Sequence, residues 1–378
     1  MNDQPAADDA VEPTTSDAAK APVIDPEQTR LLSEQAFERP LTACHWDPLD
    51  RFLFVGSEDN GIQRFAPATG EITQFVGPHD SWVRAIDTTP DGAETLSGGY
   101  DGRLVWWPTG AEKPEPIRVV DAHQGWIRAL TVSPDGNRIA TCGNDHFVRL
   151  WDRHSGELLN TFAGHQWHVY NVAFTPSGDA LVSCDLRGFV NVWNPGGDAA
   201  KETSEAADGE GADVAAGSVV GPLRELPQVE TLYKYDNTFR ADIGGARCIA
   251  FSADGGRVAL GGVTNVTNAF AGVGDTSVVL VDITTGEPSA LFAPKDKIRG
   301  TAWGVTQHRD QFWVVLAGGG GGGWFYFWRD DEPNEFFKFK LKNDGRGMSV
   351  SPDATRIAVA HADRQLRIYA LYADPTET

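Results

Sequence analysis

Residues His123 to Trp151 read HQGWIRALTVSPDGNRIATCGNDHFVRLW, and this stretch decides the fold because the chain contains it three times. The other copies run from His79 to Trp107 and from His165 to Trp193. Each copy opens on a His, has a Pro-containing turn about eleven residues later and closes an apolar run with Trp. The whole register shifts by 44 and then by 42 residues. A period of about 40 to 45 residues predicts the four-stranded blades of a β-propeller.

Weaker copies of the same unit lie on both sides of the three clear ones and bring the repeats to seven. They are Ala43 to Phe65, Cys248 to Val281, Thr301 to Trp328 and Met348 to Tyr369. The sequence therefore predicts an all-β chain, a seven-bladed β-propeller of four-stranded antiparallel blades. Each repeat is offset from its blade, so the last blade lacks its outermost strand, and the segment Arg30 to Phe37 is expected to supply it. An N-terminal strand in that place closes the ring and removes exposed sheet edges.

Three motifs within the repeats carry a family resemblance. They are Gly164-His165, Leu150-Trp151-Asp152 and the Ser-Pro-Asp-Gly run from Ser133 to Gly136. Together they resemble the WD-repeat family. The resemblance implies a propeller that serves as a scaffold for protein or peptide partners. It also implies a buried hydrogen-bonded tetrad of His, Ser or Thr, Asp and Trp in each regular blade.

Spacing places complete tetrads in two blades. Their members are His79, Ser97, Asp101 and Trp107 in blade two, and His123, Thr141, Asp145 and Trp151 in blade three. The indole N–H can only donate, the hydroxyl accepts and donates, and the imidazole bridges hydroxyl and carboxylate, so each group satisfies the next. In blade four, Arg187 stands where the Asp is expected. Because the constellation recurs at blade spacing, we expect it to be structural and expect no catalytic residues.

Two segments hold about half of the formal net charge of −21. Residues 1–28 contain seven acids and one lysine, residues 196–217 contain six acids and one lysine, and both have almost no large apolar side chains. Such composition predicts disorder. We therefore expect a disordered acidic tail at residues 1–28, a propeller at residues 29–373 with a disordered acidic insertion at residues 196–228, and a C-terminal tail at residues 374–378. The charge disfavours nucleic acid and acidic membranes as partners.

The cysteines and the apolar runs indicate a cytoplasmic protein. Cys44, Cys142, Cys184 and Cys248 lie in four different repeats without the paired spacing of a metal or redox site, so we expect buried thiols in a reducing compartment. No stretch approaches 18 consecutive apolar residues, and the N-terminus lacks the pattern of a secretory signal. We expect no membrane span, no metal and no cofactor.

One position of the innermost strand is basic in most blades. Six residues before the turn proline or its equivalent, the blades have Thr42, Arg84, Arg128, Tyr170, Arg247, Arg299 and Arg346. Trp82, Trp126 and Trp167 lie just before three of these positions. Arg and Trp dominate interface energetics and stack on each other. Two interpretations stay open: a recognition surface at the channel mouth on the top face, or structural bridges to acids of neighbouring blades.

Three departures from the repeat are large. They are the insertion Gly196 to Gln228 between the third and fourth strands of blade four, the segment Gly261 to Gly274 in blade five and the glycine run Gly318 to Gly323 in blade six. The last two expand the turn between the second and third strands of neighbouring blades. Consecutive glycines allow close approach to the backbone, either by a ligand or by another loop.

The leading functional hypothesis is a non-enzymatic protein-interaction scaffold whose top face recognises an acidic or anionic partner. The alternative is a propeller enzyme, a lactonase-like or esterase-like hydrolase with its site at the channel mouth. That enzyme requires acids and histidines converging near the axis, whereas the repeated residue there is arginine.

Overall fold

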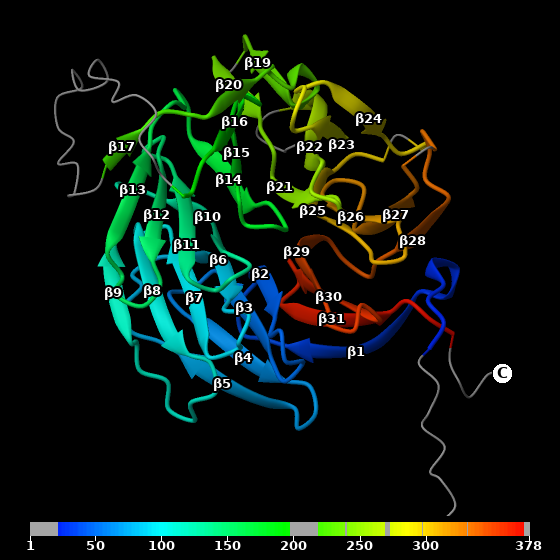
Figure 1. Ribbon diagram of the computed structural model, residues 1–378. Helices are drawn as coiled ribbons and strands as arrows, with labels where there is room; N and C mark the ends of the chain where they lie inside the picture. Colours follow the sequence, from blue (N-terminus) through cyan, green and yellow to red (C-terminus); the bar gives the residue numbers. More distant parts are fainter. Residues whose placement is uncertain are drawn as a thin grey trace, which may run out of the picture.

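The computed structural model describes residues 22–196, 218–238, 240–268, 273–296, 298–330 and 332–373. In this part of the chain, seven small and mainly antiparallel sheets stand around a central axis (Figure 1). This arrangement confirms the all-β, seven-bladed propeller. Within each blade we call the strands a to d, from the innermost to the outermost. Among the described residues, no helix is long and apolar enough to cross a membrane.

The strands follow one another blade by blade. Blades one and two contain β2 (Leu41–Trp46), β3 (Leu53–Ser57), β4 (Ile62–Ala66), β5 (Glu71–Phe75), β6 (Val83–Thr88), β7 (Glu94–Gly99), β8 (Arg103–Pro108) and β9 (Arg118–Asp121). Blades three and four contain β10 (Ile127–Val132), β11 (Arg138–Gly143), β12 (Val148–Asp152), β13 (Leu158–Phe162), β14 (Val169–Phe174), β15 (Leu181–Asp185), β16 (Val190–Trp193) and β18 (Arg224–Leu226). Blades five to seven contain β21 (Cys248–Phe251), β22 (Arg257–Asn268), β23 (Val273–Asp282), β24 (Pro288–Phe292), β25 (Thr301–Gln307), β26 (Trp313–Gly318), β27 (Trp324–Trp328), β28 (Phe337–Lys340), β29 (Gly345–Val350), β30 (Arg356–His361) and β31 (Gln365–Ala370).

The Ser-Pro-Asp-Gly run makes the tight turn between strands a and b of blade three. Asp135 Oδ1 accepts hydrogen bonds from Ser133 Oγ at 2.5 Å and from the backbone N of Asn137 at 3.0 Å. Gly136 has a φ of 74°, a conformation that glycine adopts without strain. The repeated turn motif therefore fixes where strand a ends and strand b begins.

The N-terminal strand β1 (Arg30–Ala36) closes the ring, as predicted. It pairs antiparallel with β31, so blade seven has the strand order β1-β31-β30-β29, and Figure 1 shows the blue strand beside the red one. Phe37, which follows β1, is buried in one hydrophobic cluster with Leu366 and Ile368 of blade seven and Leu41 of blade one. The first and last segments of the chain thus build one blade together.

Two boundaries of the predicted disordered segments are wrong. Residues 22–28 are ordered: a 3₁₀ helix, η1 (Pro26–Gln28), is anchored by the backbone N of Asp25, which donates to the carbonyl of Leu371 at 2.8 Å. Residues 218–228 form two strands. The strand β17 (Ser218–Val220) pairs parallel with β13 of blade three, and β18 is strand d of blade four. Residues 1–21, 197–217 and 374–378 lie outside the described residues.

The physical reason for the second error is a long-range pairing that composition does not reveal. Val220 is buried in the cluster between blades three and four, and Leu226 is buried in the cluster between blades four and five. The insertion therefore leaves β16, reaches the outer edge of the preceding blade and returns to complete its own.

Blade five has longer second and third strands than the other blades, since β22 has 12 residues and β23 has 10. The segment expected to be an expanded turn is mostly strand, because β22 and β23 stay paired as far as Thr264 with Asp275 and, after a register shift, Asn268 with Val273. A second hairpin, β19 (Tyr233–Asp236) with β20 (Ala241–Gly244), follows the 3₁₀ helix η2 (Glu230–Leu232). The two hairpins touch, since Lys234 Nζ donates to the carbonyl of Val266 at 2.6 Å.

Candidate functional site

The tetrads of blades two and three are hydrogen-bonded networks in the protein interior. In blade two, Ser97 Oγ lies 2.8 Å from His79 Nε2 and accepts from Trp107 Nε1 at 2.9 Å, while His79 Nδ1 lies 3.1 Å from Asp101 Oδ2. Blade three repeats this geometry with Thr141. Both hydroxyl groups are fully buried and already bridge an imidazole and an indole. Such a hydroxyl is engaged in structure and is not presented to a substrate.

Blade four also has a complete tetrad, which sequence spacing missed. His165 Nδ1 lies 3.1 Å from Asp185 Oδ2, and Ser183 Oγ lies 2.7 Å from His165 Nε2 and 2.8 Å from Trp193 Nε1. The acid comes two residues after the hydroxyl residue, at the end of β15, whereas in the two preceding blades it comes four residues after.

Arg187, expected at the acid position, instead joins the blade to the neighbouring hairpin. Its Nη2 lies 2.9 Å from Asp242 Oδ2, and its guanidinium carbon lies 4.2 Å from the centroid of the Trp167 ring. Trp167 itself stacks on Phe189. These residues form a cluster beside β19 and β20.

The fully buried His361 of blade seven makes folding sensitive to acid. Burial, with a smaller contribution from the charge of Arg367, lowers the pKa of His361 from 6.5 to about 4. The unfolded chain therefore binds a proton at pH values where the folded chain does not. This stabilising contribution is complete above pH 6.5 and is lost as the pH falls from 6.5 towards 4, at up to about 1.4 kcal/mol per pH unit.

We accordingly expect His361→Gln to flatten the pH dependence of stability between pH 6.5 and 4. The measurement is the free energy of unfolding from urea titrations at several pH values for both proteins. Parallel curves for the wild type and the variant would contradict the assignment to His361.

The innermost strands share a β-bulge at one position. In six of them the register with strand b skips one residue, and Arg247 lies immediately before the seventh strand, β21. A bulge redirects the side chain of the extra residue. The bulge residues are Thr42, Arg84, Arg128, Tyr170, Trp303 and Arg346, and Arg247 has the equivalent place in blade five. All except Tyr170 line a central cavity of about 510 Å³, and Tyr170 lines a smaller pocket that shares four of these residues.

Arg299 does not belong to this series, and Trp303 takes its place in blade six. Arg299 is exposed, precedes β25 and forms a backbone bridge with Asp275. The alignment from sequence failed because blade six lacks the regular turn from which the other positions were counted. The bulge between Ala302 and Gly304 shows that Trp303 is the residue of blade six equivalent to the bulge residues of the other blades.

Three arginines converge on a pocket of about 130 Å³ that shares lining residues with the central cavity. Arg84, Arg128 and Arg247 line it together with Tyr100, Tyr170 and Trp303. The guanidinium carbons of Arg128 and Arg247 lie 4.8 Å and 4.3 Å from the centroid of the Tyr170 ring, and that of Arg84 lies 5.0 Å from Trp303. We call these six residues the arginine pocket. Tyr100 and Trp303 were not among the residues singled out from the sequence.

These three arginines have no carboxylate partner in the described part of the chain. Arg84 Nη1 donates to the carbonyl of Thr42 at 3.1 Å, and Arg128 Nε donates to Asn144 Oδ1 at 2.7 Å. Burial lowers the pKa of the Arg84 guanidinium, and the positive charges of Arg247 and Arg128 lower it further. The pocket therefore gathers positive charge that the described residues leave uncompensated.

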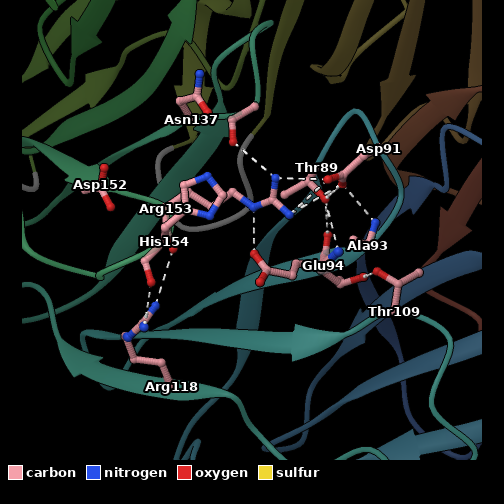
Figure 2. A network of polar contacts seen from close by, with 12 residues as sticks. Thr89, Asp91, Ala93, Glu94, Thr109, Arg118, Asn137, Asp152, Arg153 and His154 are labelled. Atoms are coloured by element: carbon pink, nitrogen blue, oxygen red, sulfur yellow. Dashed lines mark hydrogen bonds and ion pairs between the residues drawn. The ribbon is translucent and has the colours of Figure 1, made fainter.

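Other arginines do bridge neighbouring blades. Arg346 of the series lies 2.5 Å from Glu58 Oε1 of blade one. Figure 2 shows a further example, in which Arg153 of blade three reaches Glu94 Oε2 at 2.7 Å and Asp91 Oδ2 at 3.1 Å in blade two. The bridging interpretation thus holds for Arg346, and the contrast singles out the three arginines of the pocket.

An aromatic ladder borders the arginine pocket. Tyr100 stacks on Trp126 at 4.1 Å between ring centroids and on Trp82 at 6.1 Å. Trp126 also lies 4.6 Å from the guanidinium carbon of Arg128. Trp82 and Trp126 remain 43% and 41% exposed, so apolar surface is left open next to the charged pocket.

The glycine run of blade six packs against neighbouring backbone. A Cβ at Gly323 would lie 2.1 Å from the carbonyl oxygen of Asn343, and one at Gly321 would lie 2.8 Å from that of Arg299. Gly321 also donates its N–H to the carbonyl of Arg299 at 2.8 Å. Close approach by other loops of this chain accounts for Gly321 and Gly323, whereas a Cβ at Gly320 or Gly322 would meet no atom within 4 Å.

The cysteines are free and buried. Burial raises the pKa of the Cys44 thiol to about 12 and raises that of Cys248 as well. Thiols with raised pKa values are poor nucleophiles at neutral pH. Among the described residues, no group of three or more His, Cys, Asp or Glu side chains is placed to hold a metal ion.

Comparison with known proteins agrees with this architecture. The family model described as "WD domain, G-beta repeat" matches residues 70–108, 114–152 and 156–194. Each match begins near the outermost strand of one blade and ends with strand c of the next, which is the predicted offset between repeat and blade. An uncharacterized WD repeat-containing protein of Schizosaccharomyces pombe is 26% identical over 140 residues, which are 35% of this chain and 38% of that relative.

Proposed function

We propose that this seven-bladed propeller, which contains three WD40 repeats, is a non-enzymatic scaffold that binds an acidic protein partner through the arginine pocket. WD40 repeats imply a protein-interaction role, and the family is generally non-enzymatic. The proposal that the partner is acidic rests on the convergence of Arg84, Arg128 and Arg247 without an acidic side chain beside them among the described residues. We place the complex in the cytoplasm, in keeping with the free, buried thiols.

Physical chemistry favours a carboxylate-bearing or otherwise anionic surface on the partner. Guanidinium groups offer paired N–H donors that match such groups, and partly buried charge pairs are stronger than exposed ones. The net charge of −21 repels acidic molecules in general, so an acidic partner needs this local site to bind. The half-exposed Trp82 and Trp126 add apolar contact next to the charges.

Variants of the pocket test this proposal. With a partner captured by affinity purification, we expect Arg84→Gln with Arg247→Gln to weaken binding at least about tenfold, since hydrogen bonds to charged groups contribute about 1.5 to 3 kcal/mol each. The exposed Arg299→Gln is the matched control and should bind like the wild type. Wild-type binding should also weaken as salt rises, because exposed charge pairs are screened beyond about 8 Å at 0.15 M.

The same variants separate recognition from a bridging role by their stability. Removing two semi-buried charges that repel each other should leave the melting temperature unchanged or raise it, because binding sites are often built at the expense of stability. A clear fall in the melting temperature, with partner affinity unchanged, would show that these arginines hold the blades together and would refute the proposal.

A further inference from the structure

The arginine pocket carries more positive charge than one carboxylate compensates. Three guanidinium groups line about 130 Å³, and no described acid pairs with any of them. Burying a charge without a counter-charge is costly, so an anion bound in the pocket would offset the charge of the buried guanidinium groups. A carboxylate brings one negative charge, whereas a phosphate monoester brings about 1.5 to 2 at pH 7.

The hydrogen-bonding capacity of the pocket also exceeds that of a carboxylate. Arg84 uses one N–H on the carbonyl of Thr42, and Arg128 uses its Nε on Asn144. Among the described residues, no hydrogen-bond acceptor lies at the two Nη groups of Arg128 or at the guanidinium of Arg247. A phosphate monoester has three terminal oxygens, each able to accept more than one such N–H.

The pocket is built for guanidinium groups in fixed positions. Arg128 and Arg247 both lie against the ring of Tyr170, and Arg84 lies against Trp303. Ring contacts restrain the planes of the guanidinium groups, so less conformational freedom is lost when an oxyanion binds. The bulges of strands a hold the backbone from which Arg84 and Arg128 extend.

We propose that the arginine pocket binds a dianionic phosphate monoester, carried by the partner as a phosphorylated side chain. This inference rests on the proposed function, because it names the chemical group through which the acidic partner is recognised. The aromatic ladder of Trp82, Tyr100 and Trp126 then contacts the residues next to that side chain.

A pair of minimal peptides tests the proposal without knowledge of the partner. The probes are acetyl-Gly-Gly-phosphoserine-Gly-Gly-amide and the same peptide with Glu in place of phosphoserine, titrated into the full chain and followed by calorimetry. We expect the phosphopeptide to bind at least about tenfold more tightly than the Glu peptide. Arg84→Gln and Arg247→Gln should each remove most of that preference, and Arg299→Gln should keep it.

The pH dependence of peptide affinity is a second measurement. It would not differ between the two peptides if the arginines had only a structural role. The second pKa of a phosphate monoester is about 6, so lowering the pH from 7 to 5 should weaken binding of the phosphopeptide while the Glu peptide changes little. Inorganic phosphate is the third probe. It should bind more weakly than the phosphopeptide, and equal affinity would show that the pocket serves a free phosphate rather than a partner side chain.

The outcomes distinguish this inference from the proposed function. Equal affinities for the phosphoserine and Glu peptides, both lost in the Arg84 and Arg247 variants, would overturn the phosphate assignment and leave the acidic partner intact. Phosphopeptide binding that persists in both variants would overturn the inference, because the phosphate would then sit elsewhere. A captured partner that is unaffected by the double variant would refute the proposed function independently of the peptide titrations.

Discussion

A chain lacking residues 1–38 is expected to melt at least about 10 °C below a chain lacking only residues 1–21, because the larger deletion removes a whole strand and the cluster it covers. The strand β1 makes the antiparallel ladder with β31, and Phe37 is buried against Leu366 and Ile368. Glu34 accepts a hydrogen bond from Nε of the buried Arg367 at 3.0 Å. The deletion leaves β31 as an open, hydrophobic edge, which promotes aggregation.

The control deletion ends before Ile24 and Pro26, so it keeps the 3₁₀ helix and its hydrogen bond to Leu371. Differential scanning calorimetry and light scattering on both proteins measure the difference. Matching melting temperatures and equal solubility would contradict the closure of blade seven by β1.

Replacing Asp185 with Ala should destabilise the protein by about 3 kcal/mol or more, as much as replacing Asp145, because each change leaves a buried histidine and backbone N–H groups without an acceptor. Asp185 faces His165 Nδ1 and accepts from the backbone N of Arg187 at 2.9 Å and of Phe189 at 3.1 Å. Asp145 has the equivalent position at His123. Urea titration at pH 7 measures both losses.

The matched control is Asp59→Ala in blade one. Asp59 lies at the corresponding turn but accepts a single side-chain hydrogen bond, from Ser57 Oγ at 2.6 Å, and is partly exposed. We expect a loss of about 1 kcal/mol there. If Asp185→Ala cost no more than Asp59→Ala, blade four would have no functioning tetrad.

The repeat and its register could be predicted from the sequence because they are periodic. Nearly equal spacing from His79 through His123 to His165 placed the tetrads, and the offset between repeat and blade pointed to the missing strand at the N-terminus. Each of these inferences needs only the distance along the chain between like residues.

The errors arose where the periodicity breaks. In blade four the acid moved from four residues after the hydroxyl to two residues after it, so spacing selected Arg187 instead of Asp185. In blade six the turn is irregular, so counting selected Arg299 instead of Trp303. The strand β17 pairs with β13 of another blade, a contact between residues far apart in the chain for which composition carries no signal.

The arginine pocket combines a predictable and an unpredictable part. The recurrence of Arg84, Arg128 and Arg247 was visible in the sequence, but the absence of acids beside them in the described residues is a property of the three-dimensional arrangement. Arg346 shows the difference, since the same position in the repeat meets Glu58 and becomes a bridge between blades.

Binding through the arginine pocket can be measured by the rate at which individual arginines react with phenylglyoxal, followed by mass spectrometry for the free protein and for its complex with a captured partner. If the partner occupies the arginine pocket, Arg84, Arg128 and Arg247 react more slowly in the complex while the exposed Arg299 reacts at the same rate. Unchanged rates at all three pocket arginines, with protection appearing instead at Arg224 of β18, would contradict binding through the pocket and would place the binding surface at the rim that carries the insertion of blade four.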